Sequence, residues 1–330
     1  MEKLKNDLKT GNFQKIYLFY GEEEYLKKHY MEQCQKKIIP KGQEMMNLSV
    51  LEGNQVSGIQ IIEAAETLPF LSEKRLVIIK NSELFKSGRA DDLQMLVDFF
   101  PSCPESSCLL FIEAEVDRRN RGFKSIQKHG YSIEFTHLNE KDLITWVKNR
   151  CKKDQKEIDT STTIYFLRTI GSDMERLSGE IDKLIAYVNT QKQIEKKDID
   201  EICTPSLEVR IFELVKALGN KQAERALEIY SNLIFMKESP HMILAMMARQ
   251  FRLILQVKYL HDQGYPSNQI ARRIGVRDFI VKECLQQGQG FSMSALKEAL
   301  QDALNADVNM KTGKVDPILG VEMLLIQYAH

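Results

Sequence analysis

Short strand-like segments alternate with amphipathic, helix-like segments over residues 1–138, and this alternation constrains the fold more than any other feature of the sequence. Each strand-like segment is rich in β-branched or aromatic side chains and is bounded by polar or turn residues. Strands separated by helices pair in parallel through right-handed crossovers, which predicts an α/β layered domain. The expected strands are residues 16–20, 48–51, 76–79, 109–112 and 133–135, and the clearest expected helices are 22–37, 57–67 and 90–100.

The strand signal disappears after about His137, and the rest of the chain is predicted to be helical. Three short helices predict a small bundle: the first opens at residues 139–142, the second begins at about Thr160, and the third contains residues 174–185. The last segment of the bundle is 196–203, and Thr204-Pro205-Ser206 is the linker after it. The last part of the chain is expected to form a second helical domain. Its segment 241–260 is apolar on most sides and is predicted to lie at the centre. The predicted domains are therefore 1–138, 139–205 and 206–330.

Charge and cysteine content exclude several classes of protein. Lysine plus arginine and aspartate plus glutamate both number 46, so net charge gives no reason to expect a polyanion held by bulk attraction. We expect no signal peptide, because no apolar stretch follows the charged first residues, and no apolar run is long enough to cross a bilayer. The six cysteines form no Cys-x-x-Cys pair and the six histidines are dispersed. This predicts reduced thiols in a cytoplasm, with neither a disulfide framework nor a metal site.

A glycine after the first predicted strand begins like a nucleotide-binding loop, but the loop then fails. Gly21 ends the strand, and a P-loop would continue with further glycines and a Gly-Lys-Ser/Thr that hold phosphates. This chain continues with Glu22-Glu23-Glu24. Three carboxylates suit a helix start but repel a triphosphate. We therefore expect no useful ATP binding or hydrolysis, no cofactor and no catalytic residue.

Acidic residues end segment 109–117, as they end the magnesium-binding strand of an ATPase, but the adjacent Asp-Glu pair is missing. Charged residues where a strand leaves the sheet are the simpler interpretation. The turn Asp117-Arg118-Arg119-Asn120-Arg121 fits a solvated loop, and a nucleic-acid contact is the alternative.

Three large apolar residues stand in a polar-flanked connection between the helix 57–67 and the strand 76–79. They are Leu68, Phe70 and Leu71, and Pro69 between them ends the helical pattern. Connections run over the surface, so such a cluster is unusual. Two interpretations are open: the side chains plug the space under the sheet, or they form a protruding wedge for a partner's pocket.

A second motif, residues 267–276, resembles the first helix and turn of a helix-turn-helix. Arg272, Arg273 and Arg277 are placed to meet phosphates in such a motif. The second helix offers few side chains of the base-reading kind, and tight helix pairs in helical domains often show the same pattern. A structural helix pair is therefore the preferred interpretation.

Several segments, taken in order, resemble the delta subunit of the bacterial DNA polymerase III clamp loader over essentially the whole chain. Their order and spacing carry the resemblance. The segments are Leu18-Phe19-Tyr20-Gly21-Glu22-Glu23, Leu68-Pro69-Phe70 followed by Glu73-Lys74-Arg75-Leu76-Val77, Val116-Asp117-Arg118-Arg119, and Gly171-Ser172-Asp173-Met174-Glu175-Arg176-Leu177 followed by Glu180-Ile181-Asp182-Lys183-Leu184.

The resemblance implies an AAA+-like parallel-sheet domain without a functional P-loop, a small helical lid and a C-terminal helical collar. It implies a non-catalytic subunit within DNA polymerase III, a DNA-directed DNA polymerase (nucleotidyltransferase) complex. Such a subunit binds the ring-shaped sliding clamp and opens one ring interface for loading onto primed DNA. The other loader subunits are implied partners, joined through the collar as a hetero-pentamer, and no membrane is involved.

Carried over by position, the clamp-binding residues implied by the resemblance are Leu68 and Phe70, with Leu71 as a third member. The position five before Phe70 is Ala65. This departs from a glutamine-led clamp motif, so we expect the contact to rest on apolar anchors alone. Arg176 lies in the segment that carries sensor residues in active relatives, and is expected to be structural or to contact a neighbouring subunit.

Two alternatives remain. One is a working AAA+ ATPase with a degenerate loop, against which the missing lysine argues. The other is a helix-turn-helix DNA-binding regulator, against which the large N-terminal domain argues.

Overall fold

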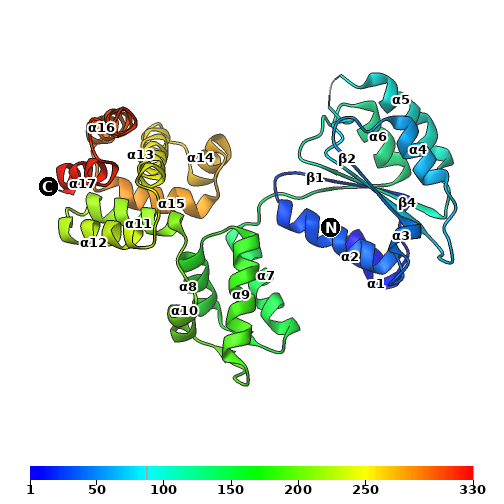
Figure 1. Cartoon of the computed structure of the whole chain (residues 1–330), viewed down its shortest axis with the longest axis horizontal. Coiled ribbons are helices and arrows are strands. Elements are labelled where there is room, and N and C mark those ends of the chain that lie inside the picture. Colours follow the sequence, from blue (N-terminus) through cyan, green and yellow to red (C-terminus); the bar gives the residue numbers. More distant parts are fainter. Residues whose placement is uncertain (87, 330) are drawn as a thin grey trace. The chain divides into compact units, whose positions relative to one another are not determined.

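A computed structural model describes residues 1–86 and 88–329 and divides the chain into two compact units, Met1–His137 and Leu138 onward. The first unit is an α/β layered domain, and the second consists of helices and one very small pair of strands (Figure 1). The predicted fold class, α/β followed by all-α, is confirmed.

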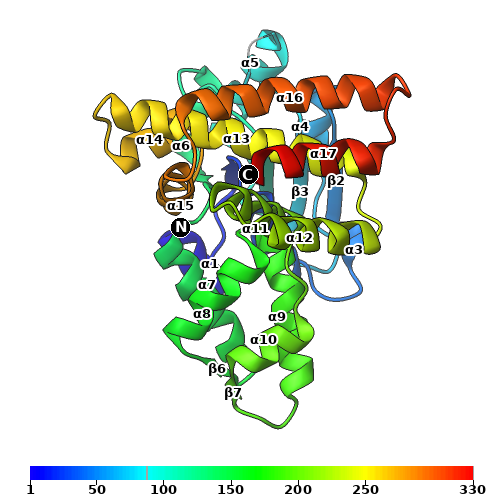
Figure 2. The ribbon, with the colours of Figure 1, turned by 90° about the vertical axis from the view of Figure 1, so that its left-hand side faces the viewer.

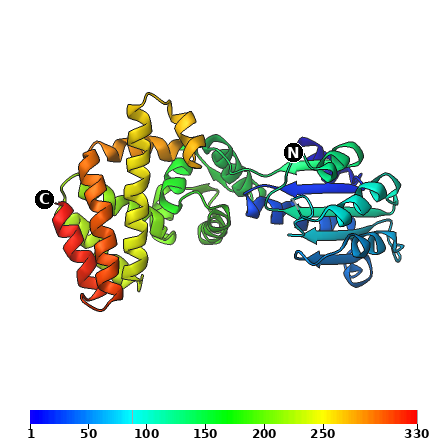
Figure 3. The same ribbon diagram turned by 90° about the horizontal axis from the view of Figure 1, so that it is seen from above.

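Five parallel strands form the sheet of the first unit, in the order β2-β3-β4-β1-β5 (Figure 3). β1 and β4 are buried along their whole length, because they lie inside the sheet and both faces are covered. The last strand begins earlier than predicted, and Phe135 lies just beyond it, where its N–H donates to the Tyr20 carbonyl oxygen at 2.7 Å. The strands are β1 (Ile16–Tyr20), β2 (Leu48–Glu52), β3 (Arg75–Lys80), β4 (Ser107–Glu113) and β5 (Tyr131–Glu134).

Helices cover both faces of this sheet (Figure 1). On one face, Ile61 of α4, Leu96 of α5 and Ile126 of α6 pack with alternate strand residues in one core. On the other face, the Tyr17 hydroxyl donates to Asp7 of α1 at 2.7 Å; α1 was not predicted. The helices are α1 (Glu2–Thr10), α2 (Glu24–Ile38), α3 (Glu44–Asn47), α4 (Gly58–Glu66), α5 (Ala90–Phe99) and α6 (Arg121–His129), with a short 3₁₀ turn at Phe100–Ser102.

Residues 139–205 contain four helices, so the prediction of three is wrong, and they also contain a pair of two-residue parallel strands. The fourth helix lies in the segment 196–203, which was assigned to the bundle but not counted as a helix. It has seven residues and only two large apolar ones, Ile199 and Ile202. Elements this short give no periodic signal in a sequence. The elements are α7 (Glu140–Lys153), β6 (Glu157–Ile158), α8 (Thr160–Ile170), α9 (Met174–Val188), β7 (Gln193–Ile194) and α10 (Lys196–Ile202).

The remaining helices pack around α13, which was predicted to be central. Met247, Phe251 and Ile254 of α13 are fully buried in a core that draws side chains from all seven helices of this part. α13, α16 and α17 run side by side (Figure 2, Figure 3). The helices are α11 (Leu207–Gly219), α12 (Ala223–Phe235), α13 (Pro240–Asp262), α14 (Ser267–Ile274), α15 (Asp278–Gly288), α16 (Met293–Lys311) and α17 (Pro317–Ala329).

All six cysteines are buried and unpaired. Burial raises the pKa of the thiols, to about 11 for Cys103 and about 12 for Cys34. Within residues 1–86 and 88–329, no three side chains of His, Cys, Asp or Glu converge as metal ligands. In the same part of the chain, no helix has the length and apolarity needed to span a membrane.

Candidate functional site

Helix α4 leads into the connection that carries the three apolar residues, and its start is firmly fixed. Ser57 and Gln60 form a reciprocal capping box. The Gly58 N–H donates to Asp92 Oδ1 at 2.7 Å, and a Cβ at Gly58 would meet the Asp92 carbonyl oxygen at 2.7 Å. α4 ends at Glu66, after which Pro69 prevents its continuation.

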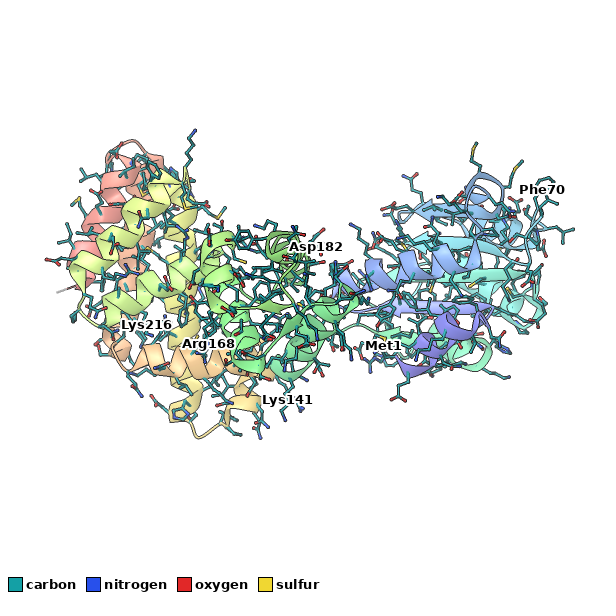
Figure 4. All side chains as sticks on the ribbon, turned by 90° about the horizontal axis from the view of Figure 1, so that it is seen from below. Met1, Phe70, Lys141, Arg168, Asp182 and Lys216 are labelled. Carbon is teal, nitrogen blue, oxygen red and sulfur yellow. The ribbon has the colours of Figure 1, made fainter. Side chains whose placement is uncertain are left out.

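The turn that follows exposes its apolar side chains. Leu68 is 78%, Phe70 55% and Leu71 79% exposed, although all three are large and hydrophobic. Phe70 lies at the periphery of the first unit (Figure 4). The interpretation of these residues as a plug under the sheet is therefore wrong. We call Leu68, Phe70 and Leu71 the apolar turn.

The backbone of the apolar turn is held by a buried amide side chain. Asn47, at the end of α3, has no exposed surface. Its Nδ2 donates to the Phe70 carbonyl oxygen at 2.8 Å, and the Phe70 N–H donates to Asn47 Oδ1 at 2.7 Å. Leu71 then adopts a left-handed conformation with φ of 50°, which costs a branched residue about 1–2 kcal/mol. The turn is thus fixed at one residue and strained at the next.

Arg75, at the start of β3, forms hydrogen bonds to residues on both sides of Asn47. Its guanidinium donates to the Met46 carbonyl oxygen and to Ser49 Oγ, each at 2.7 Å. Met45, next to Met46 in α3, is 98% exposed. Asn47 was not recognised in the sequence as part of this site, and Arg75 was noted only within a segment that carries the family resemblance, with no role assigned to it. The reason is that their hydrogen-bond partners lie 23 to 29 residues away, with no local pattern.

The segment that resembles a nucleotide loop uses its own amides inside the fold. The Gly21 N–H donates to the Ala114 carbonyl oxygen at 3.1 Å, and the Glu23 N–H donates to the Phe135 carbonyl oxygen at 3.0 Å. A Cβ at Gly21 would lie 2.4 Å from that Phe135 oxygen. Amides that cradle phosphate in a P-loop are here bonded to the residues that directly follow β4 and β5.

Charged groups fill the space beside this segment. The Glu23 carboxylate is buried and lies 2.9 Å from His137 Nδ1. Glu113, at the end of β4, accepts hydrogen bonds from the Ser82 and Glu83 N–H groups at 3.0 and 3.2 Å. Burial raises the pKa of Glu113 above its usual value, against the effect of these hydrogen bonds. The buried Glu23 carboxylate, in the segment after Gly21, disfavours a bound triphosphate.

The helix-turn-helix segment forms α14, a left-handed turn at Gly275, and α15. Val281 and Cys284 of α15 are buried in the core around α13. Arg277 donates to the Ser172 carbonyl oxygen at 2.8 Å, and the Arg273 guanidinium lies over the Tyr265 ring at 4.0 Å. These contacts support the interpretation as a structural helix pair.

Other charged candidates also have contacts within the protein. Arg119 pairs with Asp117, Arg118 pairs with Glu134, and Asn120 caps α6. Arg176 donates to the Thr204 carbonyl oxygen at 2.8 Å, which fits the structural role considered for it. The turn at 117–121 therefore has a structural explanation.

Comparisons with known proteins match nearly the whole chain. The family model described as "DNA polymerase III, delta subunit" matches residues 17–136, and that described as "DNA polymerase III delta subunit, C-terminal domain" matches residues 208–328. The DNA polymerase III subunit delta of Bacillus subtilis (strain 168) is 32% identical over 327 residues, covering 97% of this chain and 94% of the relative.

A probable DNA polymerase III subunit delta of Aquifex aeolicus (strain VF5) is 22% identical over 278 residues, covering 82% of this chain and 78% of the relative. The solved structure of the Bacillus subtilis DNA clamp loader delta protein matches with a TM-score of 0.80 and 30% identity, over 99% of each chain.

Proposed function

This chain belongs to the family of DNA polymerase III delta subunits, and we propose that it binds the sliding clamp and opens one interface of the ring. In this proposal Leu68 and Phe70 are the anchors, and Leu71 is a third contact. Residues 139–205 are the lid and residues 206–330 the collar that assembles with the other loader subunits. Primed DNA is bound within the assembled complex, and this chain performs no chemical step.

The observation that carries the proposal is the exposure of three large apolar side chains in one turn. Single exposed apolar residues are ordinary, but clustered ones favour a partner. Burying a leucine and a phenylalanine contributes about 1.5–3 kcal/mol each. The bonds between Asn47 and Phe70 fix the turn before binding, which reduces the entropy lost on docking. Two such anchors are enough to dominate an interface.

Opening a ring requires no ATP on the subunit that opens it. A ligand shifts an equilibrium by its difference in affinity for the two states, so the apolar turn needs only to bind the open interface better than the closed one. The internal hydrogen bonds of Gly21 and Glu23 support a subunit that works without nucleotide.

Exposed apolar side chains on α16 and α17 support the assignment of the collar as the assembly region. On α17 they recur at helical spacing, as Leu319, Met323 and Ile326, and α16 adds Leu304 and Val308. Aliphatic stripes of this kind suit packing against helices of another subunit.

Surface plasmon resonance of the full chain against the immobilised sliding clamp tests the proposal. The double variant Leu68→Ser with Phe70→Ser is expected to lose at least ~100-fold in affinity, because two apolar anchors are removed. A matched control, Leu319→Ser with Met323→Ser, removes two exposed apolar side chains from α17 and is expected to bind the clamp like the parent. Circular dichroism and urea unfolding verify that both variants remain folded.

Three outcomes contradict the proposal. A folded variant at Leu68 and Phe70 that binds like the parent places the clamp contact elsewhere. A variant that loses its fold along with its binding makes the two side chains structural. If the parent chain does not bind the clamp but hydrolyses ATP, the alternative of an AAA+ ATPase is favoured. If it does not bind the clamp but binds a DNA duplex sequence-specifically, the alternative of a DNA-binding regulator is favoured.

A further inference from the structure

The backbone of the apolar turn is hydrogen-bonded to Asn47, a residue with no solvent-exposed surface. Asn47 is fully buried, while Phe70, whose backbone it holds, is 55% exposed. The Asn47 side-chain amide pairs with the backbone of Phe70 as a neighbouring strand would. Its Nδ2 donates to the Phe70 carbonyl oxygen at 2.8 Å, and its Oδ1 accepts from the Phe70 N–H at 2.7 Å. Because one bond involves the N–H and the other the carbonyl oxygen of Phe70, both peptide groups that flank Phe70 are held in place.

Asn47 is itself held firmly. Its N–H donates to the Gln43 carbonyl oxygen at 3.1 Å, and its Nδ2 also contacts Gln43 Oε1 at 3.4 Å. Arg75 holds the residues on either side of it, through the Met46 carbonyl oxygen and Ser49 Oγ. The turn is therefore supported by a framework that includes the end of α3 and the starts of β2 and β3.

We propose that Asn47 is a positioning residue for clamp binding, which presents Leu68 and Phe70 in the conformation that docks. The inference rests on the proposed function of the apolar turn. Without the two hydrogen bonds, the turn samples other conformations, and the cost of ordering it is paid when the clamp binds. Leu71 has a strained backbone, with φ of 50°, so its backbone is expected to relax to another conformation once the Asn47 side-chain amide is removed.

The test compares Asn47→Ala with a matched control, Ser82→Ala. Ser82 is also fully buried and also donates a side-chain hydrogen bond in the first unit, to Glu113, but it does not contact the turn. Clamp affinity is measured on the full chain by surface plasmon resonance and corrected for the folded fraction from urea unfolding. We expect Asn47→Ala to lose about tenfold in affinity, and Ser82→Ala to stay within about twofold of the parent.

Amide hydrogen exchange separates a local effect on the turn from a general loss of stability. In the parent, the Phe70 N–H is expected to be protected despite its exposed side chain, because it donates to Asn47 Oδ1. In Asn47→Ala its exchange is expected to accelerate at least tenfold, while amides of β1 and β4 keep their protection. Asn47→Asp, which retains an acceptor for this N–H but not the donor, is expected to fall between the parent and Asn47→Ala.

The outcomes separate this inference from the proposed function. If Leu68→Ser with Phe70→Ser abolishes clamp binding while Asn47→Ala binds like the parent, the apolar turn is the anchor and the role of Asn47 is wrong. Equal losses of clamp affinity for Asn47→Ala and Ser82→Ala also contradict the role of Asn47, because the effect then comes from a general loss of stability. Fast exchange of the Phe70 amide in the parent overturns it without any variant. A parent that does not bind the clamp removes both proposals.

Discussion

The ammonium group of Lys27 donates to the carbonyl oxygen of Glu113 at 3.1 Å, and so joins α2 to the end of the central strand β4. The lysine side chain is only 1% exposed and also pairs with Glu24 at 2.6 Å. In a nucleotide-binding protein, a lysine near the start of this helix would reach phosphates. Here the cation is used for a bond between elements of the fold.

Removing this lysine should lower stability. Lys27→Ala leaves the Glu113 carbonyl group without its donor and opens space beside β4, and we expect a loss of at least ~2 kcal/mol. Urea unfolding of the parent and variant measures the difference. Lys37→Ala, on the exposed side of the same helix, serves as the control and is expected to change stability by less than about 0.5 kcal/mol.

ATP should neither bind to the isolated chain nor be hydrolysed by it. The amides of Gly21 and Glu23 are bonded to Ala114 and Phe135, and the buried Glu23 carboxylate opposes an anion. Isothermal titration calorimetry with Mg-ATP should give no heat of binding. Hydrolysis that disappears on substitution within residues 21–25 would show that the loop is functional.

The contribution of Leu71 can be separated from the conformation of its backbone. Leu71→Gly removes the side chain, and glycine adopts the observed φ of 50° without steric cost. We expect the free energy of unfolding to change by less than about 1 kcal/mol and clamp affinity to fall by about tenfold. Affinity equal to that of the parent would remove Leu71 from the contact.

Assembly should depend on the exposed stripe of α17. Leu319→Ser with Met323→Ser is expected to stay folded, since both side chains are exposed, and to be lost from the reconstituted clamp loader in size-exclusion chromatography. The variant chain should still bind the clamp. Its incorporation at parental levels would mean that the collar uses a different surface.

The carboxylate at the start of α4 predicts a specific dependence of stability on pH. The hydrogen bond from the Gly58 N–H, followed by that from Arg89, holds the pKa of Asp92 below its ordinary value of 3.8. A carboxyl group whose pKa is lowered by folding stabilises the protein above the unfolded value, and this stabilisation is lost as the pH falls through the folded value.

Asp92→Asn should therefore be about 1 kcal/mol less stable than the parent at pH 7, with the difference shrinking below pH 3.8. Urea unfolding of the parent and the variant, at pH 7 and again below pH 3.8, measures the difference in the free energy of unfolding. A difference that stays constant with pH would mean that the charge of Asp92 contributes nothing.

Helices and strands with a regular pattern of buried apolar residues were predictable from the sequence. Hydrogen bonds between segments distant in the sequence were not. β1 was predicted with its correct bounds because all five of its residues are buried and bounded by turns. α8 begins at Thr160 as predicted, since Asp159 caps it. Amphipathic helices and buried strands leave a local pattern of apolar residues, and that pattern survives in a single chain.

The candidate site was only partly visible in the sequence. Composition marked Leu68 and Phe70 as unusual for a connection, but it left open whether they were buried or exposed. Asn47 is an ordinary residue for the end of a helix, and its partner Phe70 is 23 residues away. Likewise, nothing near Lys27 indicates that its partner is the carbonyl group of Glu113, 86 residues later.

The burial of all six cysteines has a practical consequence for testing the proposed contact with the clamp. Their thiols are shielded and their pKa values are raised, so they react slowly with maleimide at neutral pH. A cysteine introduced at exposed Met45 would then be the preferred site for a fluorophore, without any of the native thiols being removed. Placed on the short helix that ends at Asn47, such a dye would lie next to the residue that holds the apolar turn, where a change in its fluorescence on adding the clamp would test the proposed docking.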